Sequence, residues 1–381
     1  MKIKKILIVI FFLFWQVLLA RADPGLYEDR IIIGTSLPLT GHAAYLGQAV
    51  LAGMQAYFHY INAQGGVYGR RIVLKVYDDA YTPPLMIGHI KRLIEKDKVF
   101  AILSPAGTPT TLTVVEICQN QRVPLLFPIT GAIELRHPVK RYIFNLRPSY
   151  WDECRAGVDF FIKRGKKRFA VFYQRDAYGL NGLQGVERRL IKYDLEPVAK
   201  ASYLRGVSKV SKQVREIMRA CPEVVALIGT ADVCAAFIKE AVSYRRAVSF
   251  FGVSFVGAKD LAKRLKDIKA RVFMTQILPP YTDLSLPAVR EYQKIFRKYF
   301  PSQPLTALSF EGFLNAKLFV YALKKAGPEV NRENLILMIE KFRNLDIGIG
   351  EKINFSETDH QGLNKVFIIQ LKNGKISFIT T

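Results

Sequence analysis

The stretch INAQGGVYGRRIVLKVYDDA, residues Ile61 to Ala80, joins the end of a helical pattern to a strand pattern. Its Gly-Gly pair can adopt the left-handed backbone that ends a helix, and its Tyr-Gly pair turns the chain into the apolar run Ile72–Tyr77. Asp78 and Asp79 end that run. This order predicts a helix packed beside a parallel strand, with two carboxylates at the strand's carboxyl end, where open α/β sheets gather their binding loops. The two acids either serve such a loop or only cap the next turn.

The same alternation extends outward in both directions. Apolar strand patterns alternate with helical patterns, which predicts a parallel sheet covered by helices on both faces. The predicted strands are Ile31–Leu37, Ile72–Tyr77, Val99–Leu103 and Val123–Phe127, and the predicted helices are Tyr45–Asn62, Leu85–Glu95 and Thr110–Gln119.

The rhythm then starts again, which predicts a second doubly wound lobe. Its strand patterns are Tyr142–Leu146, Phe169–Tyr173, Val198–Leu204, Val224–Gly229, Phe250–Val253 and Val272–Ile277, with helices such as Cys154–Lys163 and Val210–Ala220 between them. From Pro279 the chain adds the helical patterns Leu286–Phe300, Thr306–Lys325 and Glu333–Phe342 and a hairpin with Asn373-Gly374 at its turn.

The N-terminus has the pattern of a secretion signal. Lysines precede a 15-residue uncharged run from Ile6 to Ala20, too short to cross a bilayer as a helix, and Ala20-Arg21-Ala22 is a small-x-small cleavage pattern. We predict a signal peptide over residues 1–22, cleavage near Ala22 and release into the periplasm.

Composition excludes several classes of protein. Half of the 381 residues are hydrophobic, which is enough for a large core. The formal charge of +24 falls to +20 without the signal peptide, but the positive residues are scattered, so a solvated surface is favoured over nucleic-acid binding. The four cysteines are widely spaced, and buried free thiols are expected rather than a disulfide framework or a zinc site.

No catalytic motif is recognisable. Gly252 to Gly257 has one residue too many for a nucleophile elbow, no phosphate-binding loop occurs, and the five histidines show no metal spacing. We therefore expect no enzyme activity, no cofactor and no bound metal.

Small polar segments instead follow the predicted strands. Ser104-Pro105-Ala106-Gly107-Thr108 and Pro128-Ile129-Thr130-Gly131 each offer hydroxyls and backbone N–H groups before a helix, which suits a carboxylate. In the second lobe the corresponding segments are Asp176-Ala177-Tyr178-Gly179, Thr230-Ala231-Asp232 and Ser254-Phe255. The two sets are expected to face each other across a cleft.

Taken in order, these segments resemble the type I periplasmic binding proteins of the branched-chain amino acid family, the solute receptors of ABC importers. The matching features are GTSLPLTG at residues 34–41, the INAQGGVYGRRIVLKVYDDA stretch, PITGA at 128–132, DAYG at 176–179 and FSETDHQG at 355–362. The resemblance spans almost the whole mature chain. It implies two α/β lobes joined by three crossings, which close around a solute.

That resemblance implies where the lobes begin and end and which molecules the protein binds. We place the crossings near Leu146-Arg147, Ile277-Leu278 and Gly350-Glu351, so that residues 23–146 and 279–350 form the first lobe and residues 147–278 and 351–381 the second. A monomer is expected, which binds a small carboxylate-bearing solute and docks on a membrane permease. A sensing module that hands its closed state to a receptor is the alternative.

The resemblance also implies the site. Ser104, Ala106 and Thr108 match the carboxylate-binding loop, Ile129 and Thr130 add contacts, and Tyr45 and Tyr178 match the walls. The plainer alternatives are helix capping for Ser104 and Thr108 and ordinary packing for the tyrosines. Arg147 pairs either with a ligand acid or with a carboxylate at the hinge.

One position departs from the family. Where amino-acid-binding members carry an acid that holds the ligand's ammonium, this chain has Ser254, and a neutral hydroxyl cannot supply that charge-assisted bond. Asp232 or Glu311 is a possible substitute, although each can also be a capping or solvated acid. The ligand's carboxylate is therefore expected to matter more than any ammonium.

Overall fold

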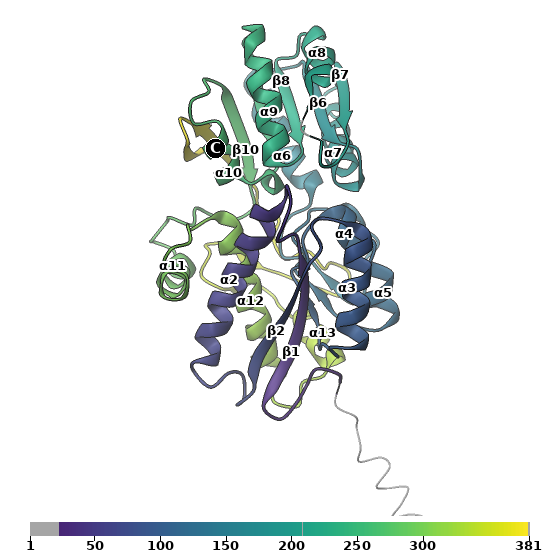
Figure 1. The fold of residues 1–381 in the computed structure, drawn as a ribbon, viewed down its shortest axis with the longest axis vertical. Helices are drawn as coiled ribbons and strands as arrows, with labels where there is room; N and C mark the ends of the chain where they lie inside the picture. The colour runs from purple at the N-terminus through teal and green to yellow at the C-terminus, as the bar shows by residue number, and fades with distance from the viewer. Residues whose placement is uncertain (1–22, 208, 380–381) are drawn as a thin grey trace, which may run out of the picture.

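The computed structural model describes residues 23–207 and 209–379 of the chain, so the predicted signal peptide lies outside the described residues. The chain forms two α/β lobes, with the first below the second in Figure 1. Each lobe is built on a sheet whose strands are mostly parallel, which confirms the predicted fold class. Within these residues no helix combines the length and apolarity needed to span a membrane.

The first lobe contains a five-stranded, all-parallel sheet in the order β2-β1-β3-β4-β5. Its elements in chain order are β1 (Arg30–Leu37), α2 (Ala44–Asn62), β2 (Arg71–Asp78), α3 (Pro83–Glu95), β3 (Ile102–Leu103), α4 (Thr108–Leu112), α5 (Val115–Asn120), β4 (Leu125–Leu126), the 3-10 turn η1 (Ile133–Leu135) and β5 (Ile143–Phe144). The single helix predicted over Thr110–Gln119 is therefore two short helices.

Strand β1 explains why this sheet needs helices on both faces. Ile31 and Ile33 belong to the core that includes α2, whereas Ile32 packs with residues of α3 on the opposite face. A strand that is apolar at successive positions is typical of a parallel sheet covered on both sides. The turn in the opening stretch is fixed by Asn62, whose side-chain amide exchanges two 2.8 Å hydrogen bonds with the backbone of Ile72.

The second lobe contains a seven-stranded sheet in the order β14-β13-β10-β9-β8-β6-β7. Five strands are parallel, and the C-terminal hairpin adds two antiparallel strands at one edge. The elements are α6 (Tyr150–Ile162), β6 (Phe169–Gln174), α7 (Ala177–Ile191), β7 (Ala199–Tyr203), α8 (Ser211–Arg219), β8 (Val224–Ile228), α9 (Ala231–Ala241), η2 (Val242–Tyr244), β9 (Ser249–Gly252), η3 (Ser254–Val256), α10 (Ala258–Arg264), β10 (Arg271–Gln276), β13 (Phe367–Lys372) and β14 (Lys375–Ile379).

Between β10 and β13 the chain returns to the first lobe. This segment contains α11 (Pro287–Tyr299), α12 (Ala307–Ala326), α13 (Arg332–Glu340) and the small pair β11 (Leu345–Asp346) and β12 (Lys352–Ile353). Helix α12 packs closely on α2 because glycines lie at the contact. A Cβ at Gly53 would lie 1.9 Å from the Ser309 carbonyl oxygen, and a Cβ at Gly312 would lie 2.2 Å from that of Val50.

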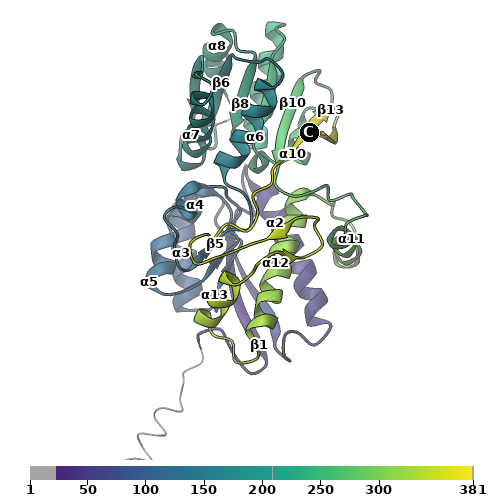
Figure 2. The ribbon, with the colours of Figure 1, turned by 180° about the vertical axis from the view of Figure 1, so that it is seen from behind.

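The third crossing lies later in the chain than the predicted position at Gly350-Glu351. Phe355 still packs on the first lobe, with ring centroids 5.7 Å from Phe144, and the backbone N–H of Gly362 donates to the Asn145 carbonyl at 2.8 Å. The chain joins the second sheet only at Phe367, and Figure 2 shows this yellow segment passing up between the lobes. The sequence pattern did not indicate that the Phe355 ring packs in the core of the first lobe.

The cysteines follow the expectation in three positions. Cys118, Cys154 and Cys234 are buried free thiols, whereas Cys221 is exposed. Cys221 lies before β8, and its sulfur accepts a hydrogen bond from the Arg246 guanidinium at 3.0 Å. The expectation of a buried thiol is therefore wrong at Cys221.

Candidate functional site

Four aromatic rings meet at the boundary between the lobes. Tyr81 comes from the loop after β2, whereas Tyr150, Tyr178 and Phe255 come from α6, α7 and η3 of the second lobe. The Phe255 ring centroid lies 4.8 Å from that of Tyr178 and 6.2 Å from that of Tyr81, and Tyr150 lies 5.2 Å from Tyr178. All four side chains are buried. These rings give the boundary an apolar, aromatic wall.

Two of these rings carry buried hydroxyls, and that of Tyr150 lies near the side chains of Thr108 and Thr130. Within the described part of the chain, the hydroxyls of Tyr81 and Tyr150 are buried and have no hydrogen-bond partner. Burial raises the pKa of Tyr150 to about 12, so this phenol remains a proton donor at neutral pH. Buried polar groups are normally paired, so an unpaired hydroxyl at a lobe boundary is available to a polar guest.

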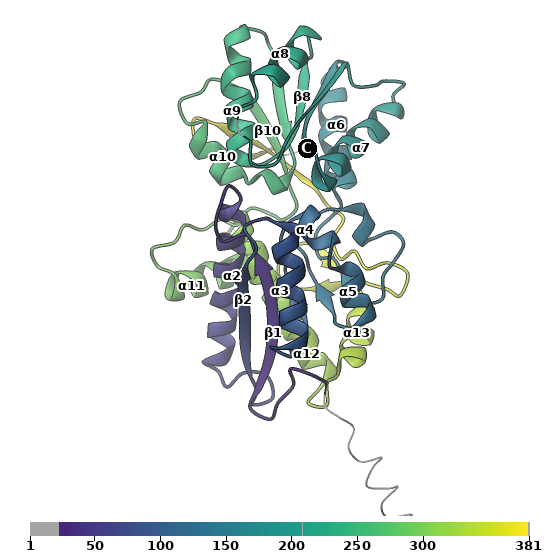
Figure 3. The same ribbon diagram turned by 45° about the vertical axis from the view of Figure 1, so that its right-hand side comes forward.

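The predicted first-lobe loops come together below this cluster. The hydroxyls of Thr108 and Thr130 lie 2.6 Å apart, and the backbones of Ala106 and Ile129 form a parallel bridge. Figure 3 shows α4, which begins at Thr108, facing the second lobe. Residues from two predicted loops are therefore neighbours at the carboxyl edge of the first sheet.

Ser104 lies in the same loop with a left-handed backbone, at φ 52°. Its hydroxyl accepts a hydrogen bond from the Asn315 side-chain amide at 2.9 Å, which leaves its own O–H free to donate. Helix capping does not explain the loop, because Gly107 is the N-cap of α4 and no side chain caps that end. Non-glycine residues with this backbone are concentrated at functional sites.

Tyr178 is placed by the cap of α7. The carboxylate of Asp176 accepts a hydrogen bond from the Tyr178 backbone N–H at 3.0 Å and so starts the helix. The Tyr178 hydroxyl donates to the Gly229 carbonyl at 3.3 Å. Burial raises the pKa of Tyr178 well above its usual value, so the side chain is neutral.

The hinge contains a buried charged network centred on Arg147. Its guanidinium donates to both carboxylate oxygens of Glu311, at 2.9 and 3.1 Å, and to the Ser254 hydroxyl at 3.2 Å. Arg147 is 1% exposed and Glu311 is 3% exposed. Of the two alternatives for Arg147, the structure therefore contains the pair with a hinge carboxylate.

Ser254 joins this pair to a second buried acid, Glu153 of α6. The Ser254 backbone N–H and hydroxyl donate to the Glu153 carboxylate at 2.7 and 3.0 Å, and Thr275 donates to it as well. Burial raises the pKa of both Glu153 and Glu311, although Arg147 opposes that shift. The sequence gave no sign of Glu153, because a lone glutamate on a helix is normally solvated.

Tyr45 and Asp232 lie at the other side of the boundary. The Tyr45 hydroxyl donates to the Val256 carbonyl at 2.8 Å and accepts from the Ala231 N–H at 3.2 Å, so it connects α2 to the second lobe. Asp232 is half-buried in the first turn of α9. Its Oδ1 is buried without a partner in the described residues.

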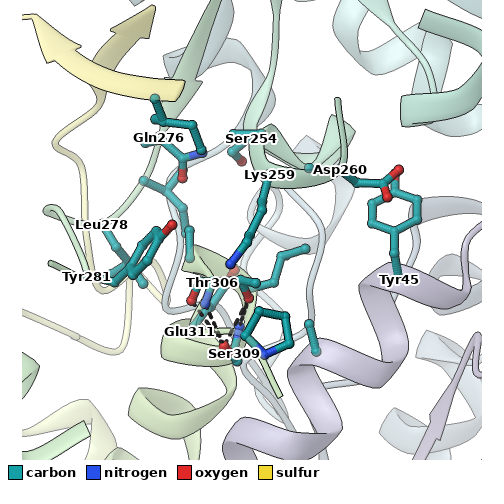
Figure 4. Close-up of a pocket in the computed structure, with 18 of the residues that line it drawn as sticks. Tyr45, Ser254, Lys259, Asp260, Gln276, Leu278, Tyr281, Thr306, Ser309 and Glu311 are labelled. Carbon is teal, nitrogen blue, oxygen red and sulfur yellow. Dashed lines mark hydrogen bonds between the residues drawn. The ribbon is translucent and has the colours of Figure 1, made fainter. Parts of the chain in front are cut away.

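A cavity of about 290 Å³ lies between the lobes beside the hinge (Figure 4). Four residues named from the sequence line it, namely Tyr45, Arg147, Ser254 and Glu311. The others do not, namely Ser104, Ala106, Thr108, Ile129, Thr130, Tyr178 and Asp232. The predicted site residues are therefore divided between the aromatic boundary and this cavity.

The acids of the opening stretch have structural roles. Asp78 accepts hydrogen bonds from the backbone of Leu39 and Ala80 at 2.8 and 2.9 Å, and from the Thr40 hydroxyl at 2.7 Å. Asp79 is fully buried and accepts from Ser36 and from the Tyr81 N–H. Of the two alternatives, the turn-fixing one accounts for these contacts, and Asp79 thereby positions Tyr81 in the aromatic cluster.

Two α/β lobes with mostly parallel sheets, three chain segments that cross between them and polar groups at the boundary are typical of a two-lobed binding protein. The sequence profile of the periplasmic binding protein family matches residues 30–375, and the chain belongs to that family.

Individual relatives agree with this assignment. A Leu/Ile/Val-binding protein homologue from Brucella suis is 24% identical over 322 residues, which cover 81% of this chain and 80% of the relative. The structure of a possible leucine/isoleucine/valine-binding protein from Rhodopirellula baltica has a TM-score of 0.88 at 28% identity and covers 95% of this chain and 98% of its own. A branched-chain amino acid ABC transporter protein from Thermus thermophilus with bound valine has a TM-score of 0.84 at 20% identity, over 93% and 96% of the two chains, and shows the shared fold.

Proposed function

We propose that this protein is an exported solute-binding receptor of an ABC importer, which traps a small carboxylate-bearing solute between its lobes and releases it unchanged to a membrane permease. The family is periplasmic, and its members among the relatives are binding proteins rather than enzymes. We further propose that the receptor works as a monomer after its signal peptide is removed near Ala22.

The observation that carries this proposal is the convergence at the lobe boundary. The first lobe contributes the adjoining hydroxyls of Thr108 and Thr130 and the donor hydroxyl of Ser104, and the second lobe contributes Tyr150 and Tyr178. A solute carboxylate placed among these groups would receive hydroxyl hydrogen bonds from the first lobe and aromatic walls from the second. A hydrogen bond to a charged group contributes about 1.5–3 kcal/mol.

The boundary offers fewer partners for a solute ammonium than for a carboxylate. Both carboxylate oxygens of Glu311 already accept from Arg147, and Ser254 is neutral, so neither offers a free anion. Of the two acids named from the sequence, Asp232 is the remaining candidate. A buried ammonium without an anionic partner is costly, which favours recognition through the carboxylate.

The test is a calorimetric comparison of leucine with 4-methyl-2-oxopentanoate, which replaces the ammonium-bearing carbon by a carbonyl. The 2-oxo acid should bind at least as tightly. Ser104→Ala and Tyr178→Ala should each weaken binding about ten- to a hundredfold, while Ser243→Ala, an exposed serine outside the boundary, serves as the matched control.

Three results would contradict the proposal. Binding of leucine alone, with Asp232→Asn abolishing it, would show that the ammonium is required. Unchanged affinity in both the Ser104 and Tyr178 variants would place the solute elsewhere. Steady turnover of the bound compound would exclude a simple receptor.

A further inference from the structure

Positive charge is concentrated at the end of the second lobe that faces away from the first lobe (Figure 1). Chain segments lead into β10, β9, β8 and β6 at this end, and the turn of the C-terminal hairpin lies beside β10. The strand register makes these segments neighbours, because Arg271 pairs with Ser249, which in turn pairs with Val224. Val224 pairs with Phe169, the first residue of β6. Since adjacent strands are about 4.8 Å apart, the five segments form one surface about 20 Å wide.

We call these five segments the basic pole. They are residues 163–168, 219–223, 245–248, 266–271 and 372–375, with the sequences KRGKKR, RACPE, RRAV, KDIKAR and KNGK. They contain thirteen lysines and arginines and two acids, and so carry +11 of the +20 that remains without the signal peptide. The loop before the edge strand β7 has one lysine and two acids, and it bounds the pole. The cations are scattered along the sequence, but the fold gathers them at one edge of one sheet.

Four of the thirteen cations have a structural role. Lys166 forms an ion pair with Glu223 at 3.1 Å. Arg164, Arg168 and Arg246 donate hydrogen bonds to carbonyl groups at the ends of α6 and α8, where a cation is favourable. The other nine cations are exposed, and their side chains form no ion pair or hydrogen bond with residues 23–207 and 209–379. The fold therefore does not account for most of this charge.

Four of these nine cations surround a hollow in the pole. Arg245, Lys269, Arg271 and Lys372 lie, together with Arg246, around a volume of about 520 Å³ between three of the five segments. Among the residues that the structure describes, no aspartate or glutamate lines this hollow. Like charges gathered in this way repel one another and destabilise the compact state. An anionic group bound among them would remove that cost.

A bilayer surface of anionic phospholipids fits the basic pole better than a nucleic acid does. Proteins that bind single-stranded nucleic acids without sequence preference add aromatic side chains on which the bases stack, whereas the five segments contain no Phe, Tyr or Trp. The family is periplasmic, and that compartment is bounded by membranes. Clusters of lysine and arginine at a membrane surface are typical of proteins that bind anionic lipids.

We propose that the basic pole docks the second lobe on a membrane surface rich in anionic phospholipids, with headgroup phosphates in the hollow among its arginines and lysines. The loops of the proposed solute site lie at the opposite, carboxyl edge of the same sheet, where Tyr178 follows β6 and Phe255 follows β9. Docking therefore leaves the boundary between the lobes free, and the receptor stays near the membrane with or without a solute. The proposal does not depend on the identity of that solute.

The experiment is flotation of the mature protein with vesicles of phosphatidylcholine that contain about 30% phosphatidylglycerol, at about 0.15 M salt. The protein should bind these vesicles, should not bind vesicles of pure phosphatidylcholine, and should dissociate as the salt concentration rises. Each lysine or arginine near such a surface contributes about fivefold to the affinity. The variant that combines Arg245→Gln, Lys269→Gln, Arg271→Gln and Lys372→Gln should therefore bind at least about a hundredfold more weakly.

The matched control removes four exposed lysines of the first lobe and so has the same net charge as the pole variant. It combines Lys75→Gln, Lys91→Gln, Lys96→Gln and Lys98→Gln. Its affinity for the vesicles should stay within about twofold of the native value, because charges far from the bilayer are screened by salt. Both variants should remain folded, since all the replaced side chains are exposed.

Other outcomes would overturn the proposal. The protein might fail that test by not binding the phosphatidylglycerol vesicles, or by binding pure phosphatidylcholine equally well. Equal weakening in the pole variant and the control would show attraction by net charge alone. If single-stranded DNA at equal phosphate concentration displaces the protein from the vesicles, the pole is a nucleic-acid site instead. None of these results changes the calorimetric test of solute binding, so the two proposals fail separately.

Discussion

Replacing Glu311 by glutamine tests whether this acid belongs to the hinge or to a ligand. The structure pairs Glu311 with Arg147 through two hydrogen bonds, and both side chains are almost fully buried. Removing one partner of a buried ion pair usually costs about 3–5 kcal/mol, because the other charge stays buried and uncompensated. Burial already raises the pKa of Glu311, so part of its desolvation cost disappears with the charge, and we expect the lower end, about 3 kcal/mol.

The assay is denaturant unfolding of the ligand-free protein, with Glu291→Gln as the control. Glu291 of α11 pairs with Lys317 of α12, the helix that carries Glu311. These two side chains are 29% and 21% exposed, so the loss of this pair should cost about 0.2–1 kcal/mol. The reasoning is refuted if Glu311→Gln costs less than about 1 kcal/mol while abolishing amino acid binding. Glu311 would then be the ammonium partner that the sequence left open.

Three further outcomes are expected. Tyr45→Phe removes two hydrogen bonds to the second lobe, which should destabilise the arrangement with the lobes in contact by about 1–3 kcal/mol. Calorimetry should therefore show solute binding weakened by about 5- to 150-fold. Tyr60→Phe, on the same helix, is the control and should leave the affinity unchanged. Burial raises the pKa of Asp79 from 3.8 to about 6, so its contribution to stability is present below pH 4 and is lost as the pH rises through about 6. The stability of Asp79→Asn relative to the native protein should therefore rise by roughly 2–3 kcal/mol from pH 4 to pH 7. A constant difference between the two proteins would contradict this. Ellman's reagent should titrate one thiol in the native protein, that of Cys221, and all four after denaturation; more than one native thiol would show that the core opens.

Periodicity and turn chemistry predicted most strands of both sheets, but Tyr142–Leu146, which the restarted pattern grouped with the second lobe, contains β5 of the first sheet. Apolar runs such as Ile31–Leu37 and Val224–Gly229 match β1 and β8 closely, because strands buried on both faces are apolar at successive positions. The third crossing was predicted too early in the chain. Its position depends on the packing of Phe355 against Phe127 and Phe144, which lie more than 200 residues away in the sequence. Local sequence patterns carry no information about such contacts.

The candidate site was predictable only in part, for a related reason. The loops with Ser104 and Thr130 could be found because small polar residues after apolar strands are visible in the sequence. The place of Glu153 beside Arg147 could not, since a glutamate on a helix normally indicates a solvated face. Only the fold shows that these charges are buried together at the hinge.

The contacts between the lobes connect binding to closure. Side chains of both lobes form hydrogen bonds to backbone groups across the boundary. Tyr45 donates to the Val256 carbonyl, Arg205 to that of Tyr81 and Lys259 to that of Leu305, and the Asn181 side-chain oxygen accepts from the Ile133 N–H. Each such bond contributes only about 0.5–1.5 kcal/mol net, and water satisfies the same groups when the lobes separate. The free-energy difference between the closed and the open arrangement of the lobes is therefore small, at most a few kcal/mol. A solute that adds one or two charge-assisted bonds at Ser104 and Thr108 would shift that balance by a similar amount, which is the range in which a small molecule can control the arrangement of two whole lobes.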